Sequence, residues 1–143
     1  MIGLVIGLVM LAAAIARWAR HRWLVITVVG QSMVPTLQDG QRIIAHRPRS
    51  RRLAVGEVVV FRLPEPQLRE ARASGDVAYR VKRIAAVGGD AMPAWLTSAG
   101  IGEQTARVPE THFAVIGDAA ASEDSRQLGL VSRDQILAWL PHR

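Results

Sequence analysis

Two residues of this sequence could form a catalytic pair: Ser32 and the only lysine, Lys82. A serine hydroxyl is a weak nucleophile and needs a neighbouring base. Lysine can be that base once burial in apolar surroundings lowers its pKa, whereas arginine keeps its proton. Of the 18 lysines and arginines, all but Lys82 are arginine, so an ordinary surface cation in this chain would be arginine. The pattern favours acyl transfer at Ser32 with Lys82 as the general base.

Ser32 follows a segment that is typical of a buried strand. Leu24–Val29 is rich in β-branched residues and ends at Gly30, and Pro35 limits any helix that could begin after it. Ser32 is therefore expected on an exposed turn at a strand end, where backbone N–H groups could face an oxyanion. The plainer interpretation, an ordinary turn serine, is open at this point.

Lys82 lies in Val77–Val87, which has strand character and ends at a Gly-Gly-Asp turn. In a strand, alternate side chains share a face, so Lys82 is expected on the same side as Arg80 and Ile84. Alternation alone does not make that side dry. A solvated lysine is the competing interpretation.

The rest of the chain shows several short strands separated by turns, which favours a mainly β, compact antiparallel domain over residues 24–143. Residues 91–107 are expected to be rich in loops, and Asp134–Leu140 to be helix or strand. Pro64–Asp76 has the charges, prolines and glycine of a connector. The further expected strands are Gln41–Ala45, Glu57–Phe61 and Val108–Ile116.

The N-terminus predicts a membrane anchor over residues 1–18. Met1–Ala16 carries no charged side chain and would form about 24 Å of helix, close to the lower limit for a bilayer span. The cations Arg17, Arg20 and Arg22 follow the apolar run, whereas a cleavable signal would have them before it. A buried or interfacial helix is the alternative. The positive-inside rule would place these arginines, and the domain with them, in the cytoplasm. The orientation expected below is the opposite one, which requires either that the rule is overridden or that the true start lies upstream with a basic leader.

The formal net charge of +6 raises the question of nucleic acid. The densest basic run after the apolar segment is HRPRSRR, from His46 to Arg52. Aromatic residues make up 5% of the chain and none interleaves with this run to stack on bases. We therefore expect the run to lie near anionic lipid headgroups, and we expect no nucleic-acid partner.

Four ordered segments together resemble the signal peptidase I family, Ser-Lys peptidases that remove signal peptides from exported proteins. The resemblance implies a β domain of the signal peptidase type with one N-terminal transmembrane helix. It also implies Ser32 as nucleophile and Lys82 as general base, with no cofactor or metal. The segments are SMVPTL (32–37), GEVVVF (56–61), YRVKRIAAVGGD (79–90) and GDAAASEDSRQLG (117–129).

The same resemblance implies supporting roles for residues around the pair. Ser122 would hydrogen-bond and orient the lysine, Asp124 and Arg126 would form an ion pair, and Arg83 would be the usual neighbour of the base. Ala119 stands where the family usually has asparagine, and the segment is one residue short before Ser122.

Two further expectations concern substrate. Some family members place an oxyanion-assisting serine two residues before the nucleophile; others have glycine, as Gly30 here, so backbone N–H groups would form the oxyanion hole. Family specificity rests on shallow apolar pockets for small residues. Val29, Met33 and Val81 flank the matched residues and are candidate pocket walls, although plain core packing explains them equally well.

The expected function is therefore that of a membrane-bound serine endopeptidase acting on exported preproteins. We expect a monomeric, single-pass protein of the cell membrane, with its catalytic domain on the extracytoplasmic side and membrane lipid as a partner. Two alternatives stay open. One is a dedicated maturation peptidase of the same superfamily for one exported or conjugation-related precursor. The other is a catalytically silent, membrane-tethered β module that binds partners.

Overall fold

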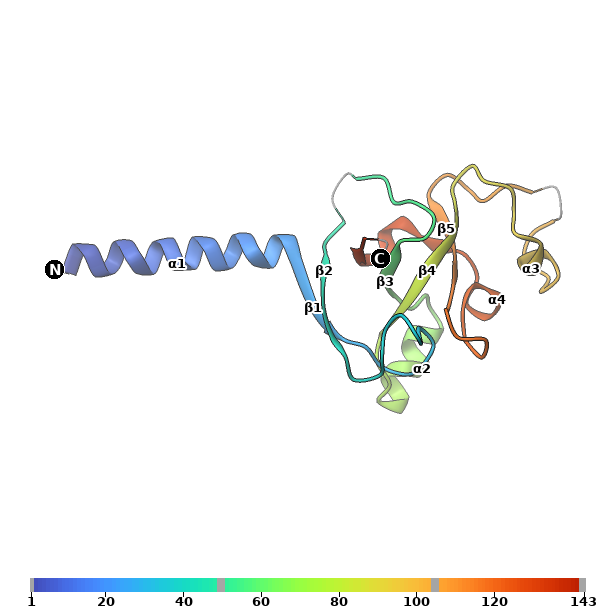
Figure 1. The fold of residues 1–143 in the computed structure, drawn as a ribbon, viewed down its shortest axis with the longest axis horizontal. Helices are drawn as coiled ribbons and strands as arrows, with labels where there is room; N and C mark the ends of the chain where they lie inside the picture. Colours follow the sequence, from blue (N-terminus) through green and yellow to red (C-terminus); the bar gives the residue numbers. More distant parts are fainter. Residues whose placement is uncertain (1, 49–50, 104–105, 142–143) are drawn as a thin grey trace.

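The computed structural model describes residues 2–48, 51–103 and 106–141, which form one long helix and one β domain (Figure 1). The helix, α1 (Ile2–Arg22), projects away from the domain, and the chain enters the first strand directly after it. The remaining helices are short: α2 (Gln67–Ser74), α3 (Ala94–Thr97), α4 (Ser125–Leu128) and the 3-10 turn η1 (Arg133–Gln135).

Within the described residues, seven strands form one sheet in the order β1-β2-β7-β3-β4-β5-β6, and every neighbouring pair is antiparallel. The prediction of a mainly β, antiparallel domain is therefore confirmed. The strands are β1 (Trp23–Thr27), β2 (Arg42–His46), β3 (Val58–Arg62), β4 (Tyr79–Val87), β5 (His112–Ile116), β6 (Val131–Ser132) and β7 (Ile136–Leu140).

The core lies on both faces of the sheet. In the central strand β3, Val59 and Phe61 belong to one apolar cluster, while Val58 and Val60 belong to the other. This explains why the strand is a continuous apolar run rather than an alternating one. β4 lies next to β3 and divides its side chains in the same way, so position 82 faces the sheet side on which Ile84 is buried.

The hairpin β1–β2 is joined to the rest of the sheet by little backbone pairing. β2 meets β7 in one register pair, His46 with Trp139, whose rings stack with centroids 5.1 Å apart. From the other side, the Tyr79 hydroxyl donates to the Thr27 carbonyl over 2.8 Å. Because the segment of Ser32 follows β1, these contacts and the core packing of the hairpin set where that segment lies.

The expected connector Pro64–Asp76 was wrong in part, because it contains α2. Leu68 and Ala71 are three residues apart and both are buried, so one helical face packs onto the core. Gly75 then ends the helix in a left-handed conformation. A stripe of two apolar residues among charged ones is too short to stand out in the sequence.

Other boundaries moved by a few residues. The expected strand Leu24–Val29 ends at Thr27, and Val108–Ile116 is a strand only from His112 onward. Asp134–Leu140 divides into the end of η1 and β7. The short elements α3, α4 and β6 were not expected.

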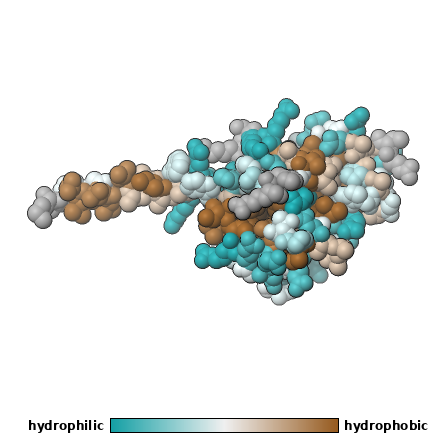
Figure 2. Space-filling view, viewed as in Figure 1, coloured by the Kyte–Doolittle hydropathy of each residue, from teal (hydrophilic) through white to brown (hydrophobic). Residues whose placement is uncertain are grey.

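α1 makes almost no contact with the domain. Gly3–Arg22 is long and apolar enough to cross a membrane, and none of its most apolar window is buried inside the protein. Figure 2 shows this helix as an apolar rod that ends in hydrophilic side chains where it meets the domain. The alternative of a helix buried in the protein's own core is therefore wrong.

Candidate active site

Ser32 lies on a compact turn between β1 and β2, and its residue is half-buried. The turn begins at Gly30, whose φ of 86° favours glycine, and whose N–H donates to Asp39 Oδ1 over 2.8 Å. Nothing in the described structure fills the space beside its α-carbon, so backbone conformation, not space, favours glycine at this position. A serine at position 30 would be strained in this backbone conformation.

Lys82 is a buried amine. Its residue is 2% exposed, and Nζ donates to Ser122 Oγ over 3.0 Å. Burial lowers the pKa of Lys82 from its ordinary 10.5 to about 8, against the opposing attraction of Asp124 and Glu123. The amine therefore loses its proton at about pH 8, well below the pH at which a solvated lysine does so.

Gly117 brings the Ser32 turn and the Lys82 partner together. A side chain on Gly117 would meet Ser122 Oγ at 1.9 Å and the Ser32 carbonyl oxygen at 2.6 Å. The same Ser32 carbonyl accepts a hydrogen bond from the Ala119 N–H over 3.0 Å. The absence of a side chain thus lets three segments meet. Within the described residues, however, the Lys82 amine bonds Ser122 and no hydrogen bond joins it to the Ser32 hydroxyl.

The loop that carries Ser122 is held by α4. Asp124 is fully buried, caps α4 through the Arg126 N–H, and binds the Arg126 guanidinium over 2.9 and 2.8 Å. Burial alone would raise the pKa of Asp124, but its hydrogen bonds with Arg126 lower it, so the carboxylate stays ionised. Ser125 Oγ also accepts from the Val115 N–H over 2.8 Å, which fastens the loop to β5. The expected pairing of Asp124 with Arg126 is present.

Arg83, next to Lys82 on β4, holds three segments on the opposite side of the strand. Its guanidinium binds Asp118 over 2.8 and 2.6 Å, Thr36 Oγ1 over 3.1 Å and the Gly56 carbonyl over 2.8 Å. The Thr36 hydroxyl in turn donates to Asp118. This bonding lowers the pKa of Asp118, so the carboxylate keeps its charge. The network ties the Ser32 turn to β4 and to the Ser122 loop.

Gly117, Asp118 and Thr36 were not among the predicted site residues. The Gly-Asp pair that opens GDAAASEDSRQLG was visible as a turn signal, but its partner on the Ser32 turn was not. Thr36 and Asp118 meet only because the fold brings together segments that are remote in sequence.

Arg80 lies two residues before Lys82 and was expected to share its face. It binds Asp76 over 2.9 Å and Glu123 over 3.4 Å, and its guanidinium also donates to the Val77 and Tyr79 carbonyls. Glu123 follows Ser122, so this pair links β4 to the Ser122 loop.

The three candidate pocket residues lie in two different environments. Val29 is 53% exposed and adjoins the Ser32 turn. Met33 and Val81 are buried in the same core cluster. Met33 and Val81 therefore fit the alternative of plain core packing, whereas Val29 is exposed beside the Ser32 turn.

A family model described as signal peptidase, peptidase S26, matches residues 2–94, which include the segments of Ser32 and Lys82. Among solved structures, the chain is similar to a signal peptidase I from Enterococcus faecalis. The identity is 19% and the TM-score 0.41, over 64% of this chain and 98% of that chain. No curated protein matches the chain at a comparable level of significance.

Proposed function

Because the chain belongs to the peptidase S26 family of signal peptidases, we propose that it cleaves signal peptides from exported preproteins with a Ser32–Lys82 dyad. One observation carries this proposal: the only lysine of the chain is buried, with a pKa lowered to about 8, beside the loop that also contacts the Ser32 turn. A buried lysine without a carboxylate bonded to it is costly as a structural element. It is suited to accept a proton.

In the proposed acylation step, the neutral Lys82 amine accepts the proton of the Ser32 hydroxyl as its oxygen attacks the scissile carbonyl. The tetrahedral intermediate collapses as Lys82 returns the proton to the leaving amine, and the signal peptide stays bound to Ser32 as an ester. Ser122 Oγ accepts one N–H of Lys82 over 3.0 Å, which leaves the nitrogen lone pair for Ser32. The hydrogen bond between Ser32 and Lys82 would form when substrate binds, because catalytic hydrogen bonds commonly tighten only in the complex.

In the deacylation step, Lys82 is again the general base, and Ser32 becomes the leaving group. Lys82 takes a proton from a water molecule, the hydroxide attacks the ester, and Ser32 recovers its proton. The oxyanion would be bound by backbone N–H groups, including that of Ser32, since Gly30 carries no hydroxyl. The Arg83–Asp118 and Arg126–Asp124 pairs act as positioning elements, because they hold the turn and the loop on either side of the amine.

The proposal includes residues 1–18 as a single-pass membrane anchor and residues 24–143 as the catalytic domain on the extracytoplasmic side. The fully exposed apolar surface of α1 supports the anchor. The outer face of the β1–β2 hairpin continues it, because the paired residues Val25 and Ile44 are 52% and 67% exposed. Every residue proposed for the site belongs to one chain, so we propose that the monomer is active.

For specificity we propose shallow pockets beside Val29, with Met33 and Val81 as their supporting layer, that take small residues before the cut. A panel of preproteins with alanine-type signal peptides tests this. Broad cleavage supports a general signal peptidase. Cleavage of one precursor alone would instead indicate a dedicated maturation peptidase.

The decisive test is the nucleophile. Ser32→Ala is expected to abolish cleavage of a signal-peptide substrate by the full chain in detergent micelles. Wild type is expected to give a substrate-derived ester on Ser32, detectable by mass spectrometry after acid quench. Ser98→Ala, at an exposed serine, is the matched control and should cleave normally. Normal cleavage by Ser32→Ala would overturn the assignment of Ser32 as nucleophile. Cleavage by wild type would by itself exclude the catalytically silent module.

A further inference from the structure

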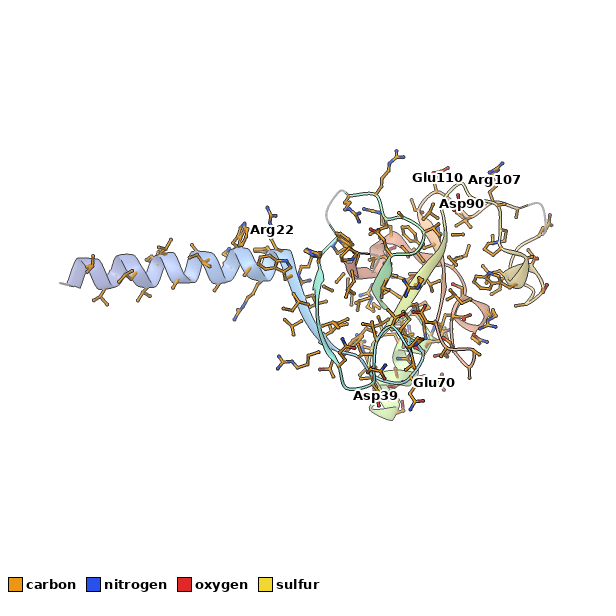
Figure 3. The ribbon with its side chains drawn as sticks, viewed as in Figure 1. Arg22, Asp39, Glu70, Asp90, Arg107 and Glu110 are labelled. Atoms are coloured by element: carbon orange, nitrogen blue, oxygen red, sulfur yellow. The ribbon has the colours of Figure 1, made fainter. Side chains whose placement is uncertain are left out.

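An open hollow of about 690 Å³ lies where α1 meets the end of β2. Four helix residues, Ala13, Ala16, Arg17 and Arg20, line it at a spacing that puts them on one helical face. Figure 3 shows this junction at the domain end of α1, where Arg22 is labelled. We call this feature the basic hollow; His21 and Arg47 complete its lining.

Arg47 is fixed at the basic hollow by the end of the helix. Its backbone N–H donates to the Arg22 carbonyl over 2.9 Å, and its side-chain Nε donates to the Arg20 carbonyl over 3.0 Å. These carbonyls are among those that a helix C-terminus leaves without partners. The contacts hold the arginine that directly follows β2 beside those of α1, so the cations of the hollow are arranged in advance.

The other cations of the basic hollow have no counter-charge in the described structure. The side chains of Arg17, Arg20 and His21 form no hydrogen bond or ion pair with any described residue, and no acidic residue lines the hollow. In the domain, Arg83 and Arg126 are each bound to a carboxylate, whereas exposed arginines such as Arg72 are bound to none within the described residues. The hollow therefore differs in gathering several unpaired cations in one place. Unpaired arginines gathered around one hollow favour an anion from outside the chain.

The neighbouring residues place this hollow at a membrane surface. Trp18 and Trp23 pack edge to face with centroids 5.3 Å apart, and such amphipathic rings are typical of the headgroup level. Towards the N-terminus the lining changes from arginine to alanine, whose small side chains leave room along an apolar helix. The hollow thus has a cationic end at the headgroup level and an apolar end towards the acyl chains.

We propose that the basic hollow binds one anionic phospholipid, with its phosphate held by Arg17, Arg20 and Arg47 and an acyl chain along Ala13 and Ala16. The inference rests on the membrane anchor of the proposed function. It adds a defined ligand site that would fix the depth and tilt of the domain at the bilayer surface, in the leaflet on the domain side.

The test uses the full chain in nonionic detergent micelles, titrated with dioleoyl phosphatidylglycerol or dioleoyl phosphatidylcholine and followed by native mass spectrometry. Wild type is expected to retain one phosphatidylglycerol at least about tenfold better than phosphatidylcholine. Arg17→Gln with Arg20→Gln should lose this preference. Arg69→Gln with Arg72→Gln, on exposed positions of α2, removes the same charge and should keep it.

Three results would overturn the site. Equal retention of both lipids would mean that the hollow does not select an anionic headgroup. Equal loss in both double variants would reduce the effect to net charge. Competition by soluble glycerol phosphate at the concentration of the lipid would mean an anion site without an acyl component. Insertion is checked separately, by co-flotation with phosphatidylcholine vesicles after carbonate extraction. Failure there refutes the anchor itself, whereas insertion without lipid preference refutes the phospholipid site alone.

Discussion

The basic hollow and the candidate active site differ in whether their cationic side chains keep the proton. At the hollow, Arg17, Arg20 and Arg47 are exposed to solvent, and arginine is the cation that does not give up its proton in proteins. In the site, Lys82 is 2% exposed and its pKa is lowered to about 8. The difference teaches that residue type follows the fate of the proton: arginine where charge must stay, lysine where it must leave.

The most direct way to break this comparison is Lys82→Arg, which puts a permanent cation at position 82. We expect kcat/KM on a signal-peptide substrate to fall by about 1000-fold or more, because an arginine does not accept the Ser32 proton. Arg72→Lys, the reverse exchange on an exposed helix position, should leave the rate unchanged. Substantial activity in the Lys82→Arg protein would end the general-base assignment.

Lys82→Met sharpens the comparison through stability. The folded-state pKa of about 8 lies below the ordinary 10.5, so between these values the unfolded chain holds a proton that the folded chain has lost. Folding stability of wild type should therefore rise with pH across this window, by up to about 3 kcal/mol. Below pH 8 the buried charge is a cost that methionine does not carry.

We thus expect Lys82→Met to be the more stable protein at pH 7, with a difference that shrinks above pH 8. Urea denaturation of the detergent-solubilised domain at several pH values measures it. Arg72→Met is the control, because an exposed arginine gives no such slope. A difference between wild type and Lys82→Met that stays constant from pH 7 to 10 would contradict the lowered pKa.

Much of this arrangement could be predicted from local sequence, because it depends on strand alternation. The position of Lys82 on the face of Ile84 follows from the two-residue period of β4, and α1 follows from an uninterrupted apolar run. The seven-strand order does not follow, because β7 inserts between β2 and β3 from the far end of the chain. Pairing at such separations leaves no local pattern.

The site residues likewise divide into those that the sequence predicted and those that depend on contacts between remote segments. Ser122 was expected from a resemblance and lies at the Lys82 amine, although the segment before it is one residue short. The need for glycine at position 117 was not foreseen, because it arises from the meeting of the Ser32 carbonyl and Ser122 Oγ. α2 was missed for a different reason, since Leu68 and Ala71 alone carry its buried face.

Arg126→Ala tests whether the Asp124–Arg126 ion pair helps to keep the pKa of Lys82 low. Asp124 attracts the protonated amine and raises the pKa of Lys82, while Arg126 binds the Asp124 carboxylate. Without Arg126, the negative charge of the buried Asp124 carboxylate would act on the Lys82 amine without a compensating cation and would raise the pKa of Lys82 further. We expect the alkaline rise of kcat/KM to move upward by on the order of one pH unit.

The control for Arg126→Ala is Arg69→Ala, which breaks the exposed pair with Glu65. That variant should keep the wild-type pH profile, because exposed pairs contribute little. Loss of activity in Arg126→Ala at all pH values, with no shift of the profile, would mean that the pair only supports the loop.

The smallest effect is expected from Glu123→Gln. In wild type, kcat/KM should rise as the pH passes about 8 and Lys82 loses its proton. Glu123 favours the protonated amine from the rim of the site, where Arg80 partly neutralises it over 3.4 Å. Removing its charge should therefore move the rise to lower pH, by a few tenths of a unit, since solvent screens an exposed carboxylate.

The matched control is Glu110→Gln, which changes an exposed carboxylate far from Glu123. Glu70 lines the same pocket as Arg80 and Glu123, and Figure 3 shows Glu110 at the opposite end of the domain from Glu70. Both variants change the net charge equally, so a shift confined to Glu123→Gln reports the local field at Lys82. An upward shift would mean that Arg80, freed from its partner, moves away from the amine. Equal shifts in the two variants would mean that the titrating group is not Lys82, because a group far from Glu123 would respond only to the net charge, which both variants change equally.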